Sequence, residues 1–211
     1  MPSNRGYNSV NARSRYQLIE AATALLGEEG YHAFSARRVA ERAGLKPQLV
    51  HYYFRSMEEL IVAVFLRTTR QYETRHDDAL ASANPVRALW KLNQYQNFAS
   101  EVTEYIALSK VFPALREEMR KSGEHFRKLQ IEAISALLET RNVDGWAMSP
   151  AALALLLSAL ARNFAIETES GITGAHAELH VTLETLFRQF DPPAAAESPA
   201  APSGDPLPTE A

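Results

Sequence analysis

The feature that most constrains the fold is a pair of short helical segments, Ser35–Ala43 and Pro47–Tyr53, separated only by the tripeptide GLK. Serine is a favourable N-cap residue, glycine favours the end of a helix, and proline is tolerated in a first helical turn. Two short helices joined by a tight turn that contains glycine are typical of a helix-turn-helix. The residues expected to pack the two helices together are small or apolar: Val39, Ala40, Ala43, Leu45, Val50 and Phe54.

The outward face of the second segment is predicted to be polar and aromatic. Lys46 can neutralise a phosphate, Gln48 can bond to adenine through two hydrogen bonds, and Tyr52 can reach a phosphate or a thymine methyl group. The first amides of the first segment, with the Ser35 hydroxyl and the nearby Arg37, would form a small anion site. A surface hairpin without any ligand would show a similar pattern. The predicted DNA-binding residues are Ser35, Arg37, Lys46, Gln48, His51, Tyr52 and Arg55.

The run FSARRVAERAGLKPQLVHYYFRSMEELIVAVF, residues 34–65, resembles the signature of the tetracycline-repressor (TetR/AcrR) family of bacterial transcriptional regulators. Ser35 matches the serine or threonine that starts the family's second helix, and Val39–Gly44 matches its IAeaAG motif. Phe54 and Ser56–Leu60 match its phenylalanine followed by s-K-e-e-L. The resemblance implies a homodimeric repressor, or less often an activator, with a DNA-binding domain and a variable ligand-binding domain in each subunit.

Two positions depart from this family pattern. His51 stands where the family often has tyrosine, and Met57 stands where a lysine usually contacts phosphate. The second contact is lost here unless Arg55 replaces it. Both changes alter the set of DNA contacts and leave the scaffold intact, so DNA binding is expected to survive.

The whole chain is predicted to be helical, because no run of period-two alternation bounded by turn residues indicates a strand. Ser56 and Glu59 form a capping-box pattern at the start of a long helix. The expected fold is all-α, with a three-helix N-terminal helix-turn-helix domain and a C-terminal helical domain for ligand binding and dimerisation. The longer helices are expected near residues 13–29, 57–81, 86–100, 103–112, 113–140, 151–170 and 175–190.

Charge divides the chain near Ser56. Residues 1–55 contain eight Arg or Lys and four Glu, a net charge of +4, and the remainder carries −7, although the whole chain carries only −3. A basic N-terminal region on an acidic body predicts that only the former meets a polyanion. The expected organisation is a DNA-binding domain at 1–55, a ligand-binding and dimerisation domain at 56–190, and a disordered tail at 191–211 that is rich in Pro, Ala and Ser.

Several protein classes are disfavoured by what the sequence lacks. There is no cysteine for a disulfide or a thiolate metal site, and the N-terminus lacks the apolar segment of a signal peptide. The longest apolar run, Ala151–Ala161, is too short to cross a bilayer. No Gly-rich phosphate loop, nucleophile elbow or HExxH motif is present. We therefore expect a cytoplasmic protein that is not an enzyme and uses no cofactor.

Within the family architecture, the body helices would surround an apolar cavity for a small effector. Predicted ligand-binding residues are Trp90, Asn93, Asn97, Phe98, Phe126, Arg162 and Asn163, with His125 as a further polar candidate. Each aromatic residue could equally belong to the core. Arg162 and Asn163 either close a pocket for an anionic or carbonyl-bearing ligand or make contacts between subunits. The predicted dimer contacts, in a four-helix bundle, are Leu155, Leu156, Leu179, Leu183, Leu186 and Phe187.

The leading hypothesis is a ligand-responsive transcriptional regulator that binds a palindromic operator as a homodimer and is released by a small, largely apolar effector. The alternative is a small-molecule-binding module whose N-terminal domain has weak or lost sequence-specific DNA binding. A third hypothesis, a metal-dependent hydrolase, would use His176, His180 and Glu184, which recur at every fourth position. A solvated helix face explains that spacing better, because three groups along one helix do not easily reach one ion.

Overall fold

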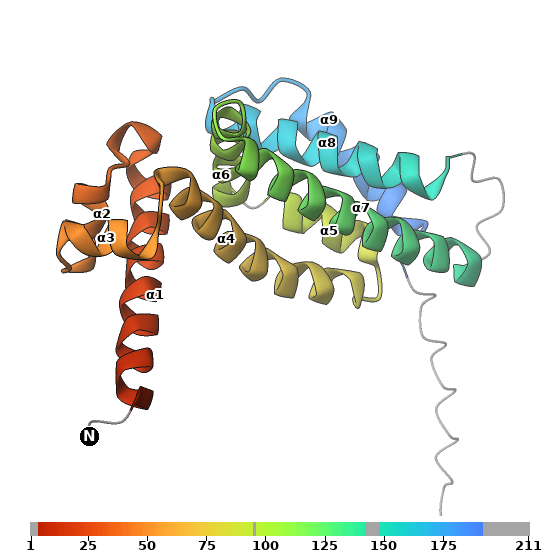
Figure 1. The fold of residues 1–211 in the computed structure, drawn as a ribbon. Coiled ribbons are helices and arrows are strands. Elements are labelled where there is room, and N and C mark those ends of the chain that lie inside the picture. The colour runs from red at the N-terminus through yellow and green to blue at the C-terminus, as the bar shows by residue number, and fades with distance from the viewer. Residues whose placement is uncertain (1–3, 95, 142–147, 192–211) are drawn as a thin grey trace, which may run out of the picture.

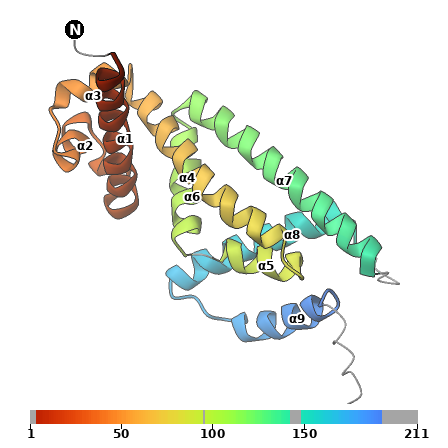
Figure 2. The same ribbon diagram turned by 90° about the horizontal axis from the view of Figure 1, so that it is seen from below.

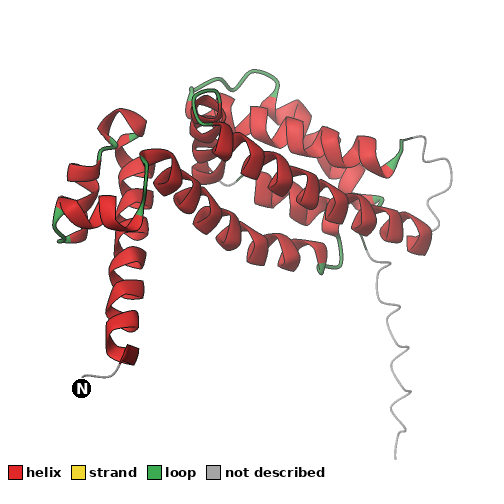
Figure 3. Cartoon of the chain, in the orientation of Figure 1, coloured by secondary structure: helices red, strands yellow, loops and turns green. Residues whose placement is uncertain are grey.

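The computed structural model describes residues 4–94, 96–141 and 148–191, and the side chains of all these residues except 4–10 and 96–101. Within these ranges the secondary structure is helical and contains no strand (Figure 3). The all-α prediction is therefore confirmed. The expected tail lies outside the described residues, apart from Asp191.

The N-terminal helices form a group of their own at one end of the molecule (Figure 1). They are α1 (Asn4–Glu29), α2 (Ala36–Ala43) and α3 (Pro47–Tyr53), with a short 3₁₀ turn, η1 (Tyr31–Ala33), after α1. The helix-turn-helix therefore has the expected bounds, although α1 begins nine residues before Arg13. Ser35 caps α2 by accepting the N–H of Arg38 at 3.3 Å. Gly44 ends α2 with a φ of 66°, in the left-handed region where glycine is favoured.

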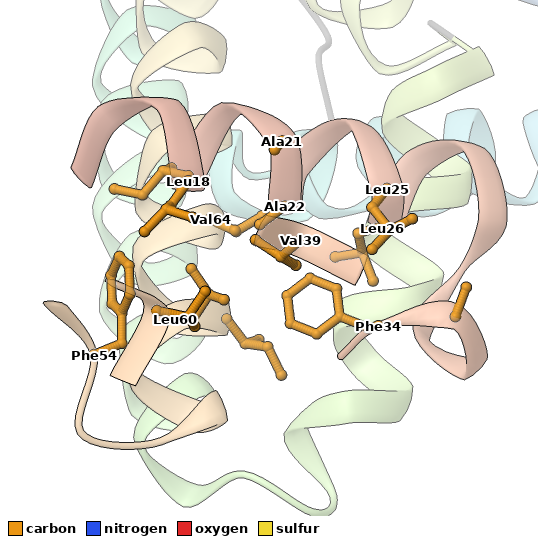
Figure 4. Packing of buried hydrophobic residues seen from close by; sticks show 14 of the residues in the cluster. Leu18, Ala21, Ala22, Leu25, Leu26, Phe34, Val39, Phe54, Leu60 and Val64 are labelled. Carbon is orange, nitrogen blue, oxygen red and sulfur yellow. The ribbon is translucent and has the colours of Figure 1, made fainter. Parts of the chain in front are cut away.

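The core of this region packs one face of α1 against α2 and α3 (Figure 4). Leu18, Ala22 and Val39 are fully buried in it, and Val50 and Phe54 are nearly so. The same core takes in residues from three later helices, so the N-terminal helices are joined to the body by continuous apolar packing. Those residues are Leu60, Ile61, Val64, Tyr105, Leu108 and Leu115.

In the described part of the chain, six helices follow Ser56 and form the body. They are α4 (Met57–Leu80), α5 (Pro85–Asn93), α6 (Gln96–Ser109), α7 (Pro113–Arg141), α8 (Pro150–Glu169) and α9 (His176–Arg188). Figure 2 shows α4 and α7 running obliquely beside each other, with α5 and α8 behind them and α9 at the far side. Ser56 accepts the N–H of Glu59 at 3.2 Å, as the capping pattern predicts. The Glu59 carboxylate accepts the N–H of Arg55 at 2.8 Å, one residue earlier than in the usual box.

The boundary between α5 and α6 differs from the expected one. A helix over 86–100 followed by another over 103–112 was expected, but α5 ends at Asn93 and α6 extends over 96–109. No glycine or proline lies between Pro85 and Pro113 to mark the break. The earlier break lets Tyr105 and Leu108 reach the N-terminal core from the second half of α6.

The last two helices complete a second core. This core gathers Trp90, Ile134, Leu157 and Phe187, among others, and α9 is held on it through the start of α5. Arg87 donates to both Glu184 carboxylate oxygens at 2.7 Å, and the Asn84 amide donates to the Phe187 carbonyl at 2.9 Å.

The helix α8 is unusually apolar. It has 20 residues and a mean hydropathy of 1.3 in an 18-residue window, which by length and composition would suffice to cross a membrane. The core helix of a globular protein meets the same condition. Here α8 packs against α5, α6 and α7.

Candidate functional site

The helix α3 presents one apolar and one polar side. Val50 is 2% exposed and the C-cap residue Phe54 is 1% exposed, whereas Tyr52 is 64% exposed. A helix anchored on its inner side in this way holds its outer side chains toward solvent. All the residues predicted to bind DNA are exposed: Ser35, Arg37, Lys46, Gln48, His51, Tyr52 and Arg55.

Two contacts with α1 anchor α3 and were not foreseen from the sequence. The Tyr53 hydroxyl donates to the Asn11 amide oxygen at 3.0 Å. The Arg15 guanidinium lies 5.1 Å from the centre of the Phe54 ring, a cation–π contact. Neither pair shows a helical spacing, because the partners lie on different helices, so only the folded chain reveals them.

Two arginines of α2 pair with carboxylates of α1, and the third does not. Arg38 donates to Glu29 of α1 at 2.9 Å, and Arg42 pairs with Glu28. Arg37 is 78% exposed, and its ion pair among the described residues is with Glu41 of its own helix, at 3.6 Å. Arg37 is therefore the arginine of α2 that is not paired with α1 in the described part of the chain.

The loop before α4 carries the two departures from the family pattern. Met57 is half-buried and packs against the N-terminal core, where a lysine in the family would point toward phosphate. Arg55 and Lys46 are exposed and make no ion pair within the described part of the chain. Arg55 is thus an exposed cation two residues before Met57.

A cavity of about 270 Å³ lies within the body, between α4, α6, α7 and α8. Three of the residues predicted to bind a ligand, Asn93, Phe126 and Arg162, line it. Further aromatic and apolar groups of the wall are Phe65, Tyr72, Tyr105, Ile106 and Met119. Further polar groups are Thr68, Ser122, Arg127, Gln130 and Ser158.

Other predicted ligand residues lie elsewhere. Trp90 does not line this cavity but belongs to the second core, where its ring centre is 6.0 Å from that of Phe164 and 6.2 Å from that of Phe187. Asn163 does not line it either: it is exposed one residue beyond Arg162 and donates to Glu167 at 2.9 Å. His125 is exposed outside the cavity. The side chains of Asn97 and Phe98 lie outside the described residues.

Sequence reasoning missed Tyr72 and most of the α7 contribution to the cavity. The signal was available in the spacing, because one face of α7 carries lining residues three or four positions apart. This face comprises Met119, Ser122, Gly123, Phe126, Arg127 and Gln130.

Burial controls the protonation of the groups around the cavity. The Tyr72 hydroxyl donates to the Asn93 amide oxygen at 3.1 Å, and burial raises the pKa of Tyr72 to about 12, so the phenol keeps its proton. Burial lowers the pKa of the neighbouring His76, which keeps that imidazole neutral at pH 7. Burial, and then the charge of Arg162, lower the pKa of Arg127. Two buried nitrogen atoms, Asn93 Nδ2 and His76 Nδ1, have no hydrogen-bond partner among the described residues.

The cavity wall and the N-terminal core share residues. Tyr105 belongs to both, and its hydroxyl lies 3.2 Å from the Thr68 hydroxyl on α4. Beside it, the Glu104 carboxylate accepts the backbone N–H of Tyr31 at 2.8 Å. The Glu58 carboxylate of α4 accepts the N–H of Ala114 at 2.9 Å, near the start of α7. Side-chain hydrogen bonds thus connect α6 to η1 and α7 to α4.

The predicted dimer residues separate into two groups. Leu155 is 58% exposed and Leu156 is 39% exposed on α8. Leu183 and Phe187 are instead buried in the second core of their own subunit. The α9 face that packs on α5 and α8 uses them. Leu179 and Leu186 are partly buried beside that core.

The two histidines of the hydrolase hypothesis contact Phe164, whereas Glu184 pairs with an arginine. His176 Nε2 lies 2.9 Å from a Glu167 carboxylate oxygen, and its ring stacks on Phe164 with centres 4.2 Å apart. Glu184 is bound by Arg87. Within the described ranges, no group of three His, Cys, Asp or Glu is arranged to hold a metal.

Sequence similarity to known proteins is concentrated in the N-terminal helices. Residues 18–64, from the buried face of α1 to the first half of α4, match the family model described as "Bacterial regulatory proteins, tetR family". Residues 18–64 are therefore a DNA-binding region of the TetR type. The resemblance found in the sequence is thus confirmed.

Individual relatives support the same assignment over different lengths. The chain is 28% identical over 67 residues to the fatty acid metabolism regulator protein of Bacillus subtilis, covering 31% of this chain and 34% of the relative. It is 34% identical over 68 residues to the HTH-type transcriptional regulator BetI of Rhizobium meliloti, covering 32% of each. These alignments span about a third of the curated relatives. A putative transcriptional regulator from Saccharomonospora viridis, solved with choline, shares the fold with a TM-score of 0.68 at 20% identity, covering 81% of this chain and 94% of that one.

Proposed function

We propose that this TetR-family protein is a ligand-responsive repressor that binds a palindromic operator as a homodimer and leaves it when a small molecule occupies the body cavity. The observation that carries the proposal is the outward face of α2 and α3, where all seven predicted DNA-binding side chains are exposed above a closed core. In this proposal residues 1–55 bind DNA, residues 56–190 bind ligand and dimerise, and the protein works in the cytoplasm.

Each group on this face has a role that suits DNA. Lys46, Arg37 and Arg55 would neutralise phosphates, and these contacts would set the position of the protein on the duplex. Gln48 and Tyr52, near the two ends of α3, would reach base edges or a thymine methyl group in the major groove.

A palindromic operator requires a two-fold dimer. The exposed Leu155 and Leu156 of α8 and Val181 of α9 supply apolar area that the subunit itself leaves uncovered. Two copies of α8 and α9 would bury this area in a four-helix bundle. The two α3 helices would then need a separation of about 34–36 Å, one turn of DNA.

Release by an effector is supported by the shared packing of Tyr105. A molecule in the cavity would press on Tyr105 and on the α4 residues Thr68 and Tyr72, and α4 leads directly to α3. An effector that favours the altered geometry must bind more weakly to the DNA-bound dimer, because the two affinities are linked. That a protein of the same fold holds choline supports a small-molecule role for this body.

The test is the salt dependence of DNA binding. The intact protein is used to select binding sequences from random duplexes, and affinity for the best sequence is measured by fluorescence anisotropy at several salt concentrations. A dimer with ~6–8 phosphate contacts gives a slope of about −5 to −7 in a plot of log K against log salt. A nearly flat slope, with equally weak binding to every duplex, would instead favour the alternative of a small-molecule-binding module.

A further inference from the structure

The charged side chains that line the cavity are both arginines. They are Arg127 of α7 and Arg162 of α8, and no Asp or Glu belongs to the wall among the described residues. Arg127 donates to the Ser158 hydroxyl at 3.3 Å, and neither guanidinium forms an ion pair within the described part of the chain. By contrast, Arg87, Arg120 and other arginines of the body are paired with carboxylates. The charged side chains of the cavity wall are therefore positive.

The remaining polar atoms strengthen this bias toward a negative ligand. The Asn93 oxygen is occupied by the Tyr72 hydroxyl, so Asn93 presents its Nδ2 as a buried donor without a partner. The Tyr72 phenol stays protonated and supplies no negative charge, since burial raises its pKa to about 12. A buried donor left without an acceptor costs free energy, and a ligand oxygen would relieve that cost.

Two like charges line the cavity: Arg127 is half-buried and Arg162 is exposed. Burial and the charge of Arg162 lower the pKa of Arg127, and the charge of Glu124 raises it, while the guanidinium keeps its proton at neutral pH. An anion bound between the two guanidinium groups would reduce their mutual repulsion. A carboxylate suits two guanidinium groups particularly well, because each can offer paired N–H donors to its oxygens.

The rest of the wall specifies the remainder of the ligand. Phe65, Met119 and Phe126 are apolar, and the volume of about 270 Å³ lies just below the ~300–1,000 Å³ usual for drug-sized ligands. We propose that the effector is a small anionic amphiphile whose carboxylate, or similar oxyanion, binds between Arg127 and Arg162 while its apolar body packs on Phe65, Met119 and Phe126. This inference rests on the proposed effector role of the cavity and names the chemical class of the effector.

The choline held by the Saccharomonospora viridis protein makes a cation the obvious competitor. Aromatic rings such as Tyr72 and Phe126 could in principle receive a quaternary ammonium group. In this chain, however, the same cavity contains two guanidinium groups and no described acidic residue to balance an added positive charge. The charge of the cavity wall thus favours an anionic over a cationic ligand, a choice that the fold alone does not determine.

The experiment compares ligands that differ only in their head group. Octanoate, octan-1-ol and octylammonium form one series, and 3-phenylpropanoate, 3-phenylpropanol and 3-phenylpropylammonium form another. Binding to the intact protein without DNA is measured by calorimetry. Each carboxylate is expected to bind roughly tenfold or more tightly than the alcohol and the ammonium ion of its series, as charge-assisted hydrogen bonds imply.

The variants test whether the two arginines cause this preference. In Arg127→Met/Arg162→Met the carboxylate and the alcohol are expected to bind equally, because the apolar contacts remain. Arg120→Met is the matched control: it removes an exposed arginine of the same helix that pairs with Glu117 outside the cavity, so the preference should persist. Should the double methionine variant not fold, Arg127→Met and Arg162→Met alone each should lose part of the preference. The charge-conserving Arg127→Lys/Arg162→Lys should keep it.

Three results would overturn the proposal: an ammonium ion that binds as tightly as its carboxylate, a preference that survives removal of both arginines, or no binding of either carboxylate at millimolar concentration. DNA binding is measured separately by its salt dependence. Failure of the carboxylate preference with a steep salt slope would reject the ligand class alone. A flat salt slope with an intact preference would reject the DNA-binding role alone.

Discussion

The helix-turn-helix region and the body cavity differ in how completely their buried groups are packed and hydrogen-bonded. Around α2 and α3, the side chains of Leu18, Val39, Val50 and Phe54 are almost completely buried, and Ser35 caps α2. The two buried side-chain nitrogens without a partner in the described part of the chain, Asn93 Nδ2 and His76 Nδ1, both lie in the body.

This contrast relates packing to function. Where a core is closed, the backbone geometry is fixed, and α3 can present the same surface to every duplex. Where donors and charges are left uncompensated, binding a ligand offsets a cost already present in the empty protein. The two regions meet at Tyr105, which contributes to the closed core and to the open cavity.

The largest expected effect is on stability and compares one phenylalanine from each region. Phe54→Ala, in the closed core, should cost about 3–5 kcal/mol of unfolding free energy, because it leaves a void among fixed neighbours. Phe126→Ala should cost only about 1 kcal/mol, because Phe126 is half-buried and already borders a cavity. Urea denaturation measures both values. Equal losses would show that the two regions are packed alike.

The next effect is on DNA affinity. Lys46→Ala and Tyr52→Ala should each weaken operator binding by about 1–3 kcal/mol without lowering stability, because both side chains are exposed. Lys91→Ala, which removes an exposed lysine from the end of α5, is the control and should leave affinity unchanged. Anisotropy titrations with the selected duplex provide the measurement. Unaltered affinity in both α3 variants would refute the placement of α3 in the major groove.

A smaller effect is expected from removing a helix cap, and it compares α4, which joins the two regions, with α8, which lies wholly in the body. Ser56 caps α4 and Ser149 caps α8, each accepting an N–H at 3.2 Å. Replacing either serine by alanine should cost about 0.5–2 kcal/mol. Hydrogen exchange followed by mass spectrometry should then show faster exchange at the first turn of the affected helix, and only Ser56→Ala should also weaken DNA binding. If Ser149→Ala weakened it equally, α4 would have no special role in orienting α3.

The smallest expected effect is a gain in stability from replacing a glycine that lines the cavity. Gly123 lies within the uninterrupted helix α7, and no atom lies within 4 Å of a Cβ added there. Gly123→Ala should therefore stabilise the protein by about 0.5–1 kcal/mol through helix propensity. A thermal unfolding curve would reveal the gain as a higher Tm. A loss of stability would mean that α7 needs the flexibility of glycine at the cavity.

Local patterns were sufficient for the helix-turn-helix because every signal there acts over a few residues. Ser35, Gly44 and Ser56 end or begin helices through their own side-chain and backbone properties, and the apolar spacing of α1 predicts its buried face. The same local reasoning did not place Trp90 in the second core, because aromatic residues at helical spacing line a core or a cavity with equal ease. It also placed the break between α5 and α6 too late in the chain, because no glycine or proline marks it.

Long-range packing decided the rest. Whether Leu183 and Phe187 face a partner or their own subunit depends on how α9 settles on α5, through Arg87 and Asn84, which lie about a hundred residues earlier in the chain. The meeting of Arg127 and Arg162 around one cavity likewise depends on α7 and α8 lying side by side. Helix ends and apolar faces can be inferred from neighbouring residues, whereas the side chains that share a cavity are chosen only when separate helices come together.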